Sequence, residues 1–136
     1  MPKAVGIDYG TKSVGIAISD PSQIIATALC TTNNKDVFKF LIELLQKENI
    51  NTIVVGEATN LDGTDTDSTS EILTFVEKLK TLFPKVKVAK IDERFTSKIA
   101  FQSIIDSGIK RKKRQNKSLI DEVSATIILQ DYLTYN

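Results

Sequence analysis

The chain has 136 residues, with 18 Lys and Arg against 17 Asp and Glu, so its net charge of +1 gives no global reason to bind nucleic acid. It contains one cysteine, Cys30, and no histidine, which excludes the usual Cys/His zinc sites and any histidine-based catalysis. The remaining chemistry depends on carboxylates, hydroxyls, lysines and metal ions. The length predicts a single domain, residues 1–136, large enough to bury a core without disulfides.

The N-terminus lacks the basic-then-apolar pattern of a secretory signal. No apolar run approaches the roughly 20 residues that a membrane-spanning helix needs. We therefore expect a soluble, cytoplasmic protein without a membrane partner.

Three short segments rich in Val, Ile, Ala and Thr predict consecutive strands at residues 3–8, 12–19 and 23–31. The connections between them are polar and short, which predicts an antiparallel meander.

The first strand carries different residue types on its two faces. Because side chains alternate, Val5 and Ile7 share one face and Gly6 and Asp8 share the other. Asp8 then ends the strand beside a residue without a side chain, and we expect open space around it. A carboxylate there is costly in a core and suits a metal or phosphate site. The structural alternative is an aspartate that bonds the backbone of a hairpin turn.

Helices and strands alternate through the rest of the chain. The pattern predicts a helix after an Asn33-Asn34 cap, a strand at 50–55, a helix from a Ser68/Glu71 capping box to Pro84, a strand at 86–91, a helix from Thr96 or Ser97 to Gly108, and a final helix from a Ser118/Asp121 capping box to Leu133. The predicted fold class is α/β, a mixed five-stranded sheet with helices on its faces.

Acidic residues stand at three element ends: Asp8, either Asp92 or Glu93, and Asp121. The ends of central strands converge in such sheets. Two carboxylates 4 Å apart repel by about 4 kcal/mol at an effective dielectric constant near 20, so three of them need cations. Mg²⁺ or Mn²⁺ suits a site built from carboxylates, and a pair of ions would activate water against a phosphodiester.

Each acid also has a structural explanation. Asp121 has the position of a capping acid near a helix start, where the helix dipole favours negative charge. The Asp92-Glu93-Arg94 triplet has the composition of a surface salt-bridge patch.

The segment Lys110–Lys117 holds six basic residues in eight and directly precedes Asp121. A solvated loop is one explanation. The other is a clamp for the phosphate backbone beside the metal site. No aromatic residue interrupts the charges, so we expect backbone recognition with little sequence readout.

Three motifs read together resemble one family: Gly6–Ala17, Asp92–Ser97 and Asp121–Leu133. They are similar to the YqgF/RuvX family, bacterial proteins described as Holliday-junction resolvases and as pre-16S rRNA nucleases. The resemblance covers essentially the whole chain, including the basic loop before the last helix. It implies an RNase H-like fold, a cytoplasmic location and cleavage at the 5′ end of the 16S rRNA precursor.

The resemblance also implies the site. Asp8, Glu93 and Asp121 match the family's metal-binding catalytic acids, which favours Glu93 over Asp92, and Arg94 would contact substrate or brace the site. The cofactor would be Mg²⁺ or Mn²⁺. The residues expected to bind substrate are Arg94, Lys98, Arg111, Lys112, Lys113, Arg114 and Lys117.

One position departs from the family pattern. After the fourth strand the family usually has Gly-Leu-Pro or a similar apolar step, whereas this chain has Gly56-Glu57-Ala58. Glu57 is either a fourth metal ligand or a solvated loop acid.

The favoured function is therefore a metal-dependent endonuclease that processes the 5′ end of pre-16S rRNA. The alternatives are a Holliday junction resolvase that acts on branched DNA in recombination and repair, and a non-catalytic RNA- or polymerase-associated binding module. Phosphotransfer by actin-like ATPases is less suitable, because those enzymes hold nucleotide between two such domains. The sequence leaves monomer and homodimer open.

Overall fold

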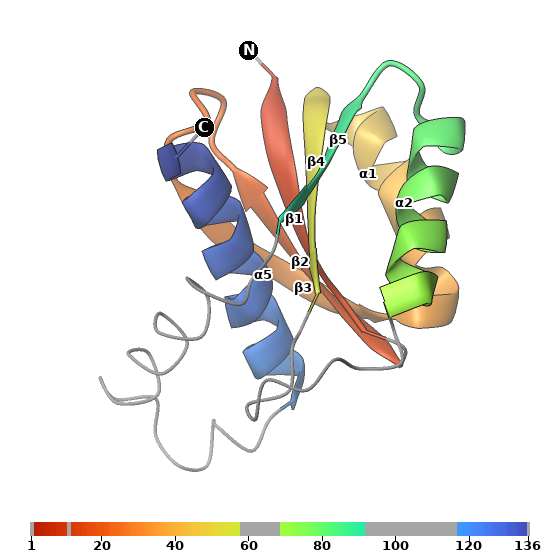
Figure 1. Ribbon diagram of the computed structural model, residues 1–136. Coiled ribbons are helices and arrows are strands. Elements are labelled where there is room, and N and C mark those ends of the chain that lie inside the picture. The colour runs from red at the N-terminus through yellow and green to blue at the C-terminus, as the bar shows by residue number, and fades with distance from the viewer. Residues whose placement is uncertain (1, 11, 58–68, 92–116, 136) are drawn as a thin grey trace.

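The computed structural model describes residues 2–10, 12–57, 69–91 and 117–135; for 57, 69–70 and 117–121 it describes the backbone alone. The elements in chain order are β1 (Lys3–Tyr9), β2 (Ser13–Ser19), β3 (Ala26–Asn33), the 3₁₀ turn η1 (Asn34–Asp36), α1 (Val37–Lys47), β4 (Ile50–Glu57), α2 (Thr69–Leu82), β5 (Lys87–Ile91) and α5 (Lys117–Tyr135). Figure 1 shows a central sheet with α1 and α2 on one face and α5 on the other.

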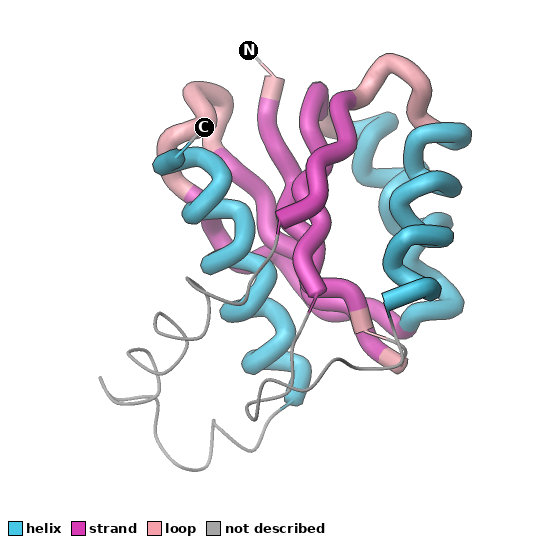
Figure 2. The backbone as a smooth tube through the Cα atoms, viewed as in Figure 1, coloured by secondary structure: helices cyan, strands magenta, loops and turns pink. Residues whose placement is uncertain are grey.

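The five strands form one sheet in the order β3-β2-β1-β4-β5. β1 pairs antiparallel with β2 and parallel with β4, and β5 adds to β4 in parallel. The prediction of a mixed sheet led by an antiparallel meander is confirmed, and the first strand lies at its centre (Figure 2).

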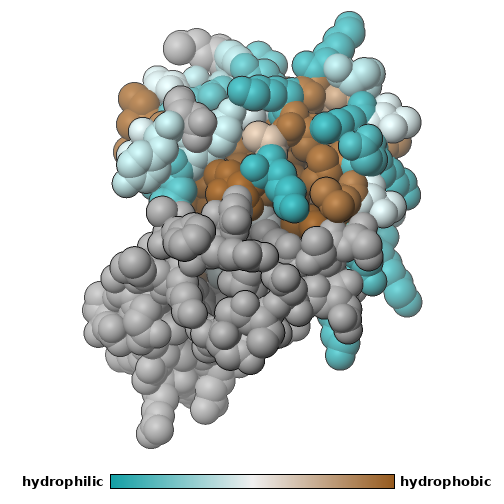
Figure 3. All heavy atoms as spheres, in the orientation of Figure 1, coloured by the Kyte–Doolittle hydropathy of each residue, from teal (hydrophilic) through white to brown (hydrophobic). Residues whose placement is uncertain are grey.

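The face of the sheet that meets α1 and α2 carries the larger apolar cluster. Val5 and Ile7 of β1 are fully buried there, together with Leu41 of α1 and Ile72 and Leu79 of α2. Figure 3 shows apolar side chains gathered between β5 and α2 on the side in view. The predicted alternation along β1 is thus confirmed, because Val5 and Ile7 both face this layer.

The opposite face is lined by small residues, which let α5 approach the sheet closely. Ala4 and Ala17 pack there against Ala125 and Leu129 of α5. A Cβ placed on Gly6 would lie 2.5 Å from Leu129 Cβ and 2.8 Å from the Ala125 carbonyl oxygen. The expectation of open space around Asp8 is therefore wrong on the side of Gly6, because α5 fills that space.

The helix starts differ from those predicted. Neither Asn33 nor Asp36 makes a side-chain cap at η1 or α1. The Asn34 side chain instead donates a hydrogen bond of 2.7 Å to the Gly10 carbonyl and ties η1 to the β1–β2 turn. The final helix begins at Lys117, so Ser118 lies inside it. The predicted helix from Thr96 or Ser97 to Gly108 and the Ser68 cap lie outside the described residues.

The end of α5 is attached to the loop between β2 and β3 by one side chain. Gln130 Oε1 accepts a 2.9 Å hydrogen bond from the Ala26 amide, and Gln130 Nε2 donates a 2.9 Å bond to the Ile24 carbonyl. In the same loop Gln23 has a φ of 56°, a conformation uncommon outside glycine.

None of the helices in the described ranges is long and apolar enough to cross a membrane.

Candidate functional site

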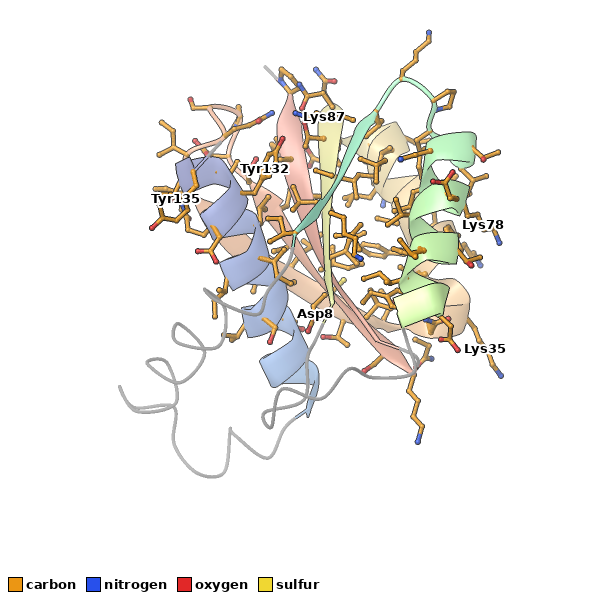
Figure 4. The ribbon with its side chains drawn as sticks, viewed as in Figure 1. Asp8, Lys35, Lys78, Lys87, Tyr132 and Tyr135 are labelled. Carbon is orange, nitrogen blue, oxygen red and sulfur yellow. The ribbon has the colours of Figure 1, made fainter. Side chains whose placement is uncertain are left out.

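Asp8 lies near the carboxyl end of the central strand and is almost wholly buried, with 3% of its surface exposed. Its partners on the neighbouring strands are Gly15 of β2 and Gly56 of β4, so neither strand contributes a side chain beside it. In Figure 4 Asp8 lies on the α5 side of the sheet, away from Lys78 and Lys35. The sequence therefore places a buried carboxylate where both neighbouring strands leave its flanks clear.

The carboxyl ends of three parallel strands meet at the same edge of the sheet. Asp8 pairs with Gly56, and Gly56 pairs with Ile91 of β5, which puts the three residues in one row. Adjacent strands are about 4.8 Å apart, so Ile91 lies about 10 Å from Asp8. Glu93 follows two residues after Ile91, and Glu57 pairs with Tyr9 in the next row.

Helix α5 brings residue 121 toward this same edge. Ala125 and Leu129 pack over Gly6, and Asp121 lies one turn before Ala125 in the direction of Asp8. Asp121 is the fifth residue of α5, beyond its first turn, which contains no acid. The explanation of Asp121 as a capping or dipole-stabilising acid therefore loses support, because that effect falls off within the first turn.

Asp8, the one proposed ligand whose side chain is described, suits a hard cation. Asp8 offers oxygen ligands, which Mg²⁺ and Mn²⁺ prefer, and a buried carboxylate is costly without a compensating charge. Within the described residues, no group of three or more Asp, Glu, His or Cys side chains is placed to hold a metal. The side chains of Glu57, Glu93 and Asp121, which would complete the set, lie outside the described part.

The predicted substrate contacts lie almost entirely in the segment 92–116, which the structure does not describe. They are Arg94, Lys98, Arg111, Lys112, Lys113 and Arg114. Lys117 is the first residue of α5, where only the backbone is described.

A pocket on the other face of the sheet was missed by the sequence analysis. It has a volume of about 340 Å³, and its lining includes Tyr9, Phe38 and Phe75. The Tyr9 and Phe75 rings lie 4.7 Å apart and the Phe38 and Phe75 rings 5.2 Å apart, measured between centroids. The Nζ of Lys78 lies 4.3 Å from the Phe38 centroid. Phe38 and Phe75 fit the helical periodicity of a core, and Tyr9 directly follows the first predicted strand, so no local pattern indicated that the three would line a pocket.

Among the residues that the structure describes, Asp20 and Cys30 have shifted pKa values. The backbone N–H groups of Ile25 and Ile24 donate to Asp20 Oδ1 and lower the pKa of that carboxyl. Burial raises the pKa of the Cys30 thiol, and the negative charge of Glu122 raises it further.

Comparisons with known proteins agree with the sequence motifs. A family model described as "RuvX: Holliday junction resolvase" matches residues 2–135. A Flavobacterium psychrophilum protein named "Putative pre-16S rRNA nuclease" is 50% identical over 134 residues, covering 98% of each chain. A Flavobacterium johnsoniae protein of the same name is 48% identical, covering 98% of this chain and 97% of its own.

Solved structures with low sequence identity share the fold. Thermus thermophilus RuvC in complex with a Holliday junction substrate matches with a TM-score of 0.56 at 14% identity, over 98% of this chain and 94% of its own. The fowlpox virus Holliday junction resolvase matches with a TM-score of 0.56 at 13% identity, over 98% and 99%. The predicted RNase H-like architecture is confirmed by these matches.

Proposed function

The chain belongs to the RuvX family, and on that premise we propose that it is a metal-dependent endonuclease that processes the 5′ end of pre-16S rRNA in the cytoplasm. The observation that carries the proposal is the buried carboxylate of Asp8 at the sheet edge, in a row with the ends of β4 and β5. The choice of RNA substrate is supported by the names of relatives up to 50% identical over nearly the full chain.

We assign Asp8, Glu93 and Asp121 as the residues that would hold two Mg²⁺ or Mn²⁺ ions, with Glu57 as a candidate fourth ligand. The backbone supports this assignment, because Asp8, Glu57 and Asp121 lie on elements that run to one edge of the sheet. β5 reaches the same edge at Ile91, two residues before Glu93 in the sequence. When bound, such ions activate water and stabilise the leaving oxygen of a phosphodiester. The protein positions the acids and excludes water around the buried Asp8.

The basic residues between β5 and α5 would hold the nucleic-acid backbone beside the acids. The proposed contacts are Arg94, Lys98, Arg111, Lys112, Lys113, Arg114 and Lys117. The basic residues directly precede α5, which begins at Lys117 and packs on β1. Asp121 lies on the same helix, at its end nearer to Asp8. Neutralising Lys112, Lys113 and Arg114 together should weaken binding and reduce its salt slope by about 0.7 for each lost single-strand phosphate contact. Unchanged affinity and slope would remove these residues from the proposal.

The deciding experiment is a cleavage assay with Mg²⁺ or Mn²⁺ on two substrates, a 16S precursor 5′-leader RNA and a four-way DNA junction. We expect cleavage of the RNA to leave a 5′-phosphate and a 3′-hydroxyl. Asp8→Asn should reduce its rate about a thousandfold, because metal-dependent charge stabilisation contributes several kcal/mol. Asp36→Asn is the matched control, since it makes the same change at an exposed position whose side chain makes no cap hydrogen bond.

Holliday junction resolution is the second candidate, and the description of the matching family model favours it. Cleavage of the junction rather than the RNA would establish it. A resolvase should then be a homodimer whose two sites cut symmetric strands, whereas an rRNA nuclease is free to act as a monomer. If purified protein cuts neither substrate, a non-catalytic RNA- or polymerase-associated module becomes the better explanation.

A further inference from the structure

The aromatic pocket opens at the same end of β1 as Asp8 but on the opposite face. Tyr9 follows Asp8 in β1, and successive side chains of a strand project to opposite sides. Asn34, which also lines the pocket, is bonded to the Gly10 carbonyl in the turn directly after β1. A nucleic-acid strand at the proposed acidic edge would therefore lie at the same end of the sheet as the pocket.

The lining combines flat apolar surface with polar groups of both kinds. Phe38 is partly exposed, whereas Tyr9 and Phe75 are nearly buried behind it, at 7% and 4%. Lys78 brings an ammonium donor over the Phe38 ring, and Glu71 brings a carboxylate acceptor. The Asn34 amide makes one hydrogen bond within the described residues and can offer both a donor and an acceptor.

On these grounds, and on the basis of the proposed nuclease function, we propose that the pocket binds one unpaired nucleobase of the substrate strand. A base has π faces for Phe38 and an edge of donors and acceptors that matches Lys78, Glu71 and Asn34. The volume of about 340 Å³ is at the lower end for ligand sites and suits a single ring system.

Other ligands fit less well. A phosphate in this pocket would face the Glu71 carboxylate, and a purely apolar side chain would bury the charges of Glu71 and Lys78 without partners. A base satisfies both polar groups and leaves its phosphate outside. The pocket thus adds base recognition to a site expected to read the backbone alone.

The test compares the affinity for a single-stranded oligoribonucleotide with that for a strand of equal length and charge built from stable abasic residues. Chelator prevents cleavage during the measurement. We expect the wild type to bind the natural strand about 5- to 100-fold more tightly, the range that stacking of one base supports. Equal affinities, or binding of a free nucleoside monophosphate with no preference between the strands, would overturn the proposal.

Two phenylalanines of α1 give a matched pair of variants. Phe38 lines the pocket and Phe40 does not, yet both are partly buried against the same core. Phe38→Leu should bring the ratio of the two affinities close to one, and Phe40→Leu should keep it. A ratio that survives Phe38→Leu would overturn the proposal.

Two lysines of α2 give a second pair that leaves the core intact. The Nζ of Lys78 lies over the Phe38 ring, whereas the Nζ of Lys80 lies 3.7 Å from Glu77 Oε1 on the surface. Lys78→Gln should lower the ratio of the two affinities at least twofold, and Lys80→Gln should leave it unchanged. If both variants have the same ratio, Lys78 does not contact the base. If the protein cleaves RNA but binds the natural and abasic strands equally, the base-binding pocket is refuted and the nuclease function stands. If it prefers the natural strand but cleaves nothing, the nuclease function is refuted and the pocket stands.

Discussion

Replacing Gly6 with alanine should test how closely α5 is packed on the central strand. The new Cβ would lie 2.5 Å from Leu129 Cβ and 2.8 Å from the Ala125 carbonyl oxygen. Neither atom can move by rotating a side chain, because one is a Cβ and the other belongs to the helix backbone. The clash can be relieved only by displacing α5 or β1.

The expected loss of stability follows from two opposing effects. Overpacking of a well-filled core costs about 1–3 kcal/mol, and two fixed contacts argue for the upper end of that range. Alanine is favoured over glycine within a strand by about 0.5–1 kcal/mol, which offsets part of the loss. We therefore expect Gly6→Ala to lower the free energy of unfolding by about 2 kcal/mol and Tm by roughly 6–10 °C.

Thermal and urea unfolding would measure this change. Ala28→Val is the control, since it adds volume at an exposed position of the edge strand β3 and should change stability by less than about 0.5 kcal/mol. A Gly6→Ala protein as stable as the wild type, or more stable, would show that α5 does not approach β1 as closely as described. If Gly6→Ala loses more nuclease activity than its unfolded fraction accounts for, the packing of α5 also positions the acids at the sheet edge.

Three further changes test other contacts. Gln130→Ala removes two hydrogen bonds to the β2–β3 loop and should cost about 1–3 kcal/mol, with faster amide exchange in that loop; Gln46→Ala, at an exposed position of α1, should do neither. Because its pKa is lowered in the folded state, Asp20 stabilises the protein above about pH 4, and this contribution should fade as the pH falls through the folded pKa. The stability of Asp20→Asn should therefore fall less steeply in acid than that of the wild type. Identical profiles of stability against pH for the two proteins would refute this role of Asp20. The raised pKa of Cys30 predicts slow alkylation at pH 7–8, and Glu122→Gln should speed it; an unchanged or slower rate would contradict the effect of Glu122.

The local pattern of β1 was sufficient to predict its faces. Val5 and Ile7 alternate with Gly6 and Asp8, and period-2 alternation fixes which pair meets the larger core. The pattern did not reveal that Gly6 makes room for a helix, since Leu129 is more than a hundred residues away in the sequence. In the sequence, a glycine beside a carboxylate reads the same whether the space above the glycine stays open or is filled by a helix.

Features made by distant contacts escaped the sequence for the same reason. Asn34 is a residue type typical of helix caps, but its side-chain amide donates a hydrogen bond to the Gly10 carbonyl, because η1 lies against the β1–β2 turn. Gln130 occupies an ordinary helical position and nothing local pairs it with residues 24–26. The motif resemblance named Glu93 and Asp121, and their roles stay predictions because their side chains lie outside the described residues.

The attachment of α5 also sets an order of events during synthesis. The Ala26 amide and its partner Gln130 are 104 residues apart, an interval of about 5–20 s at ordinary translation rates. Throughout that interval the small apolar face formed by Ala4, Ala17 and Val54 has no helix to cover it. A nascent chain therefore carries an uncovered sheet face on the ribosome until α5 has been synthesised and can pack against it.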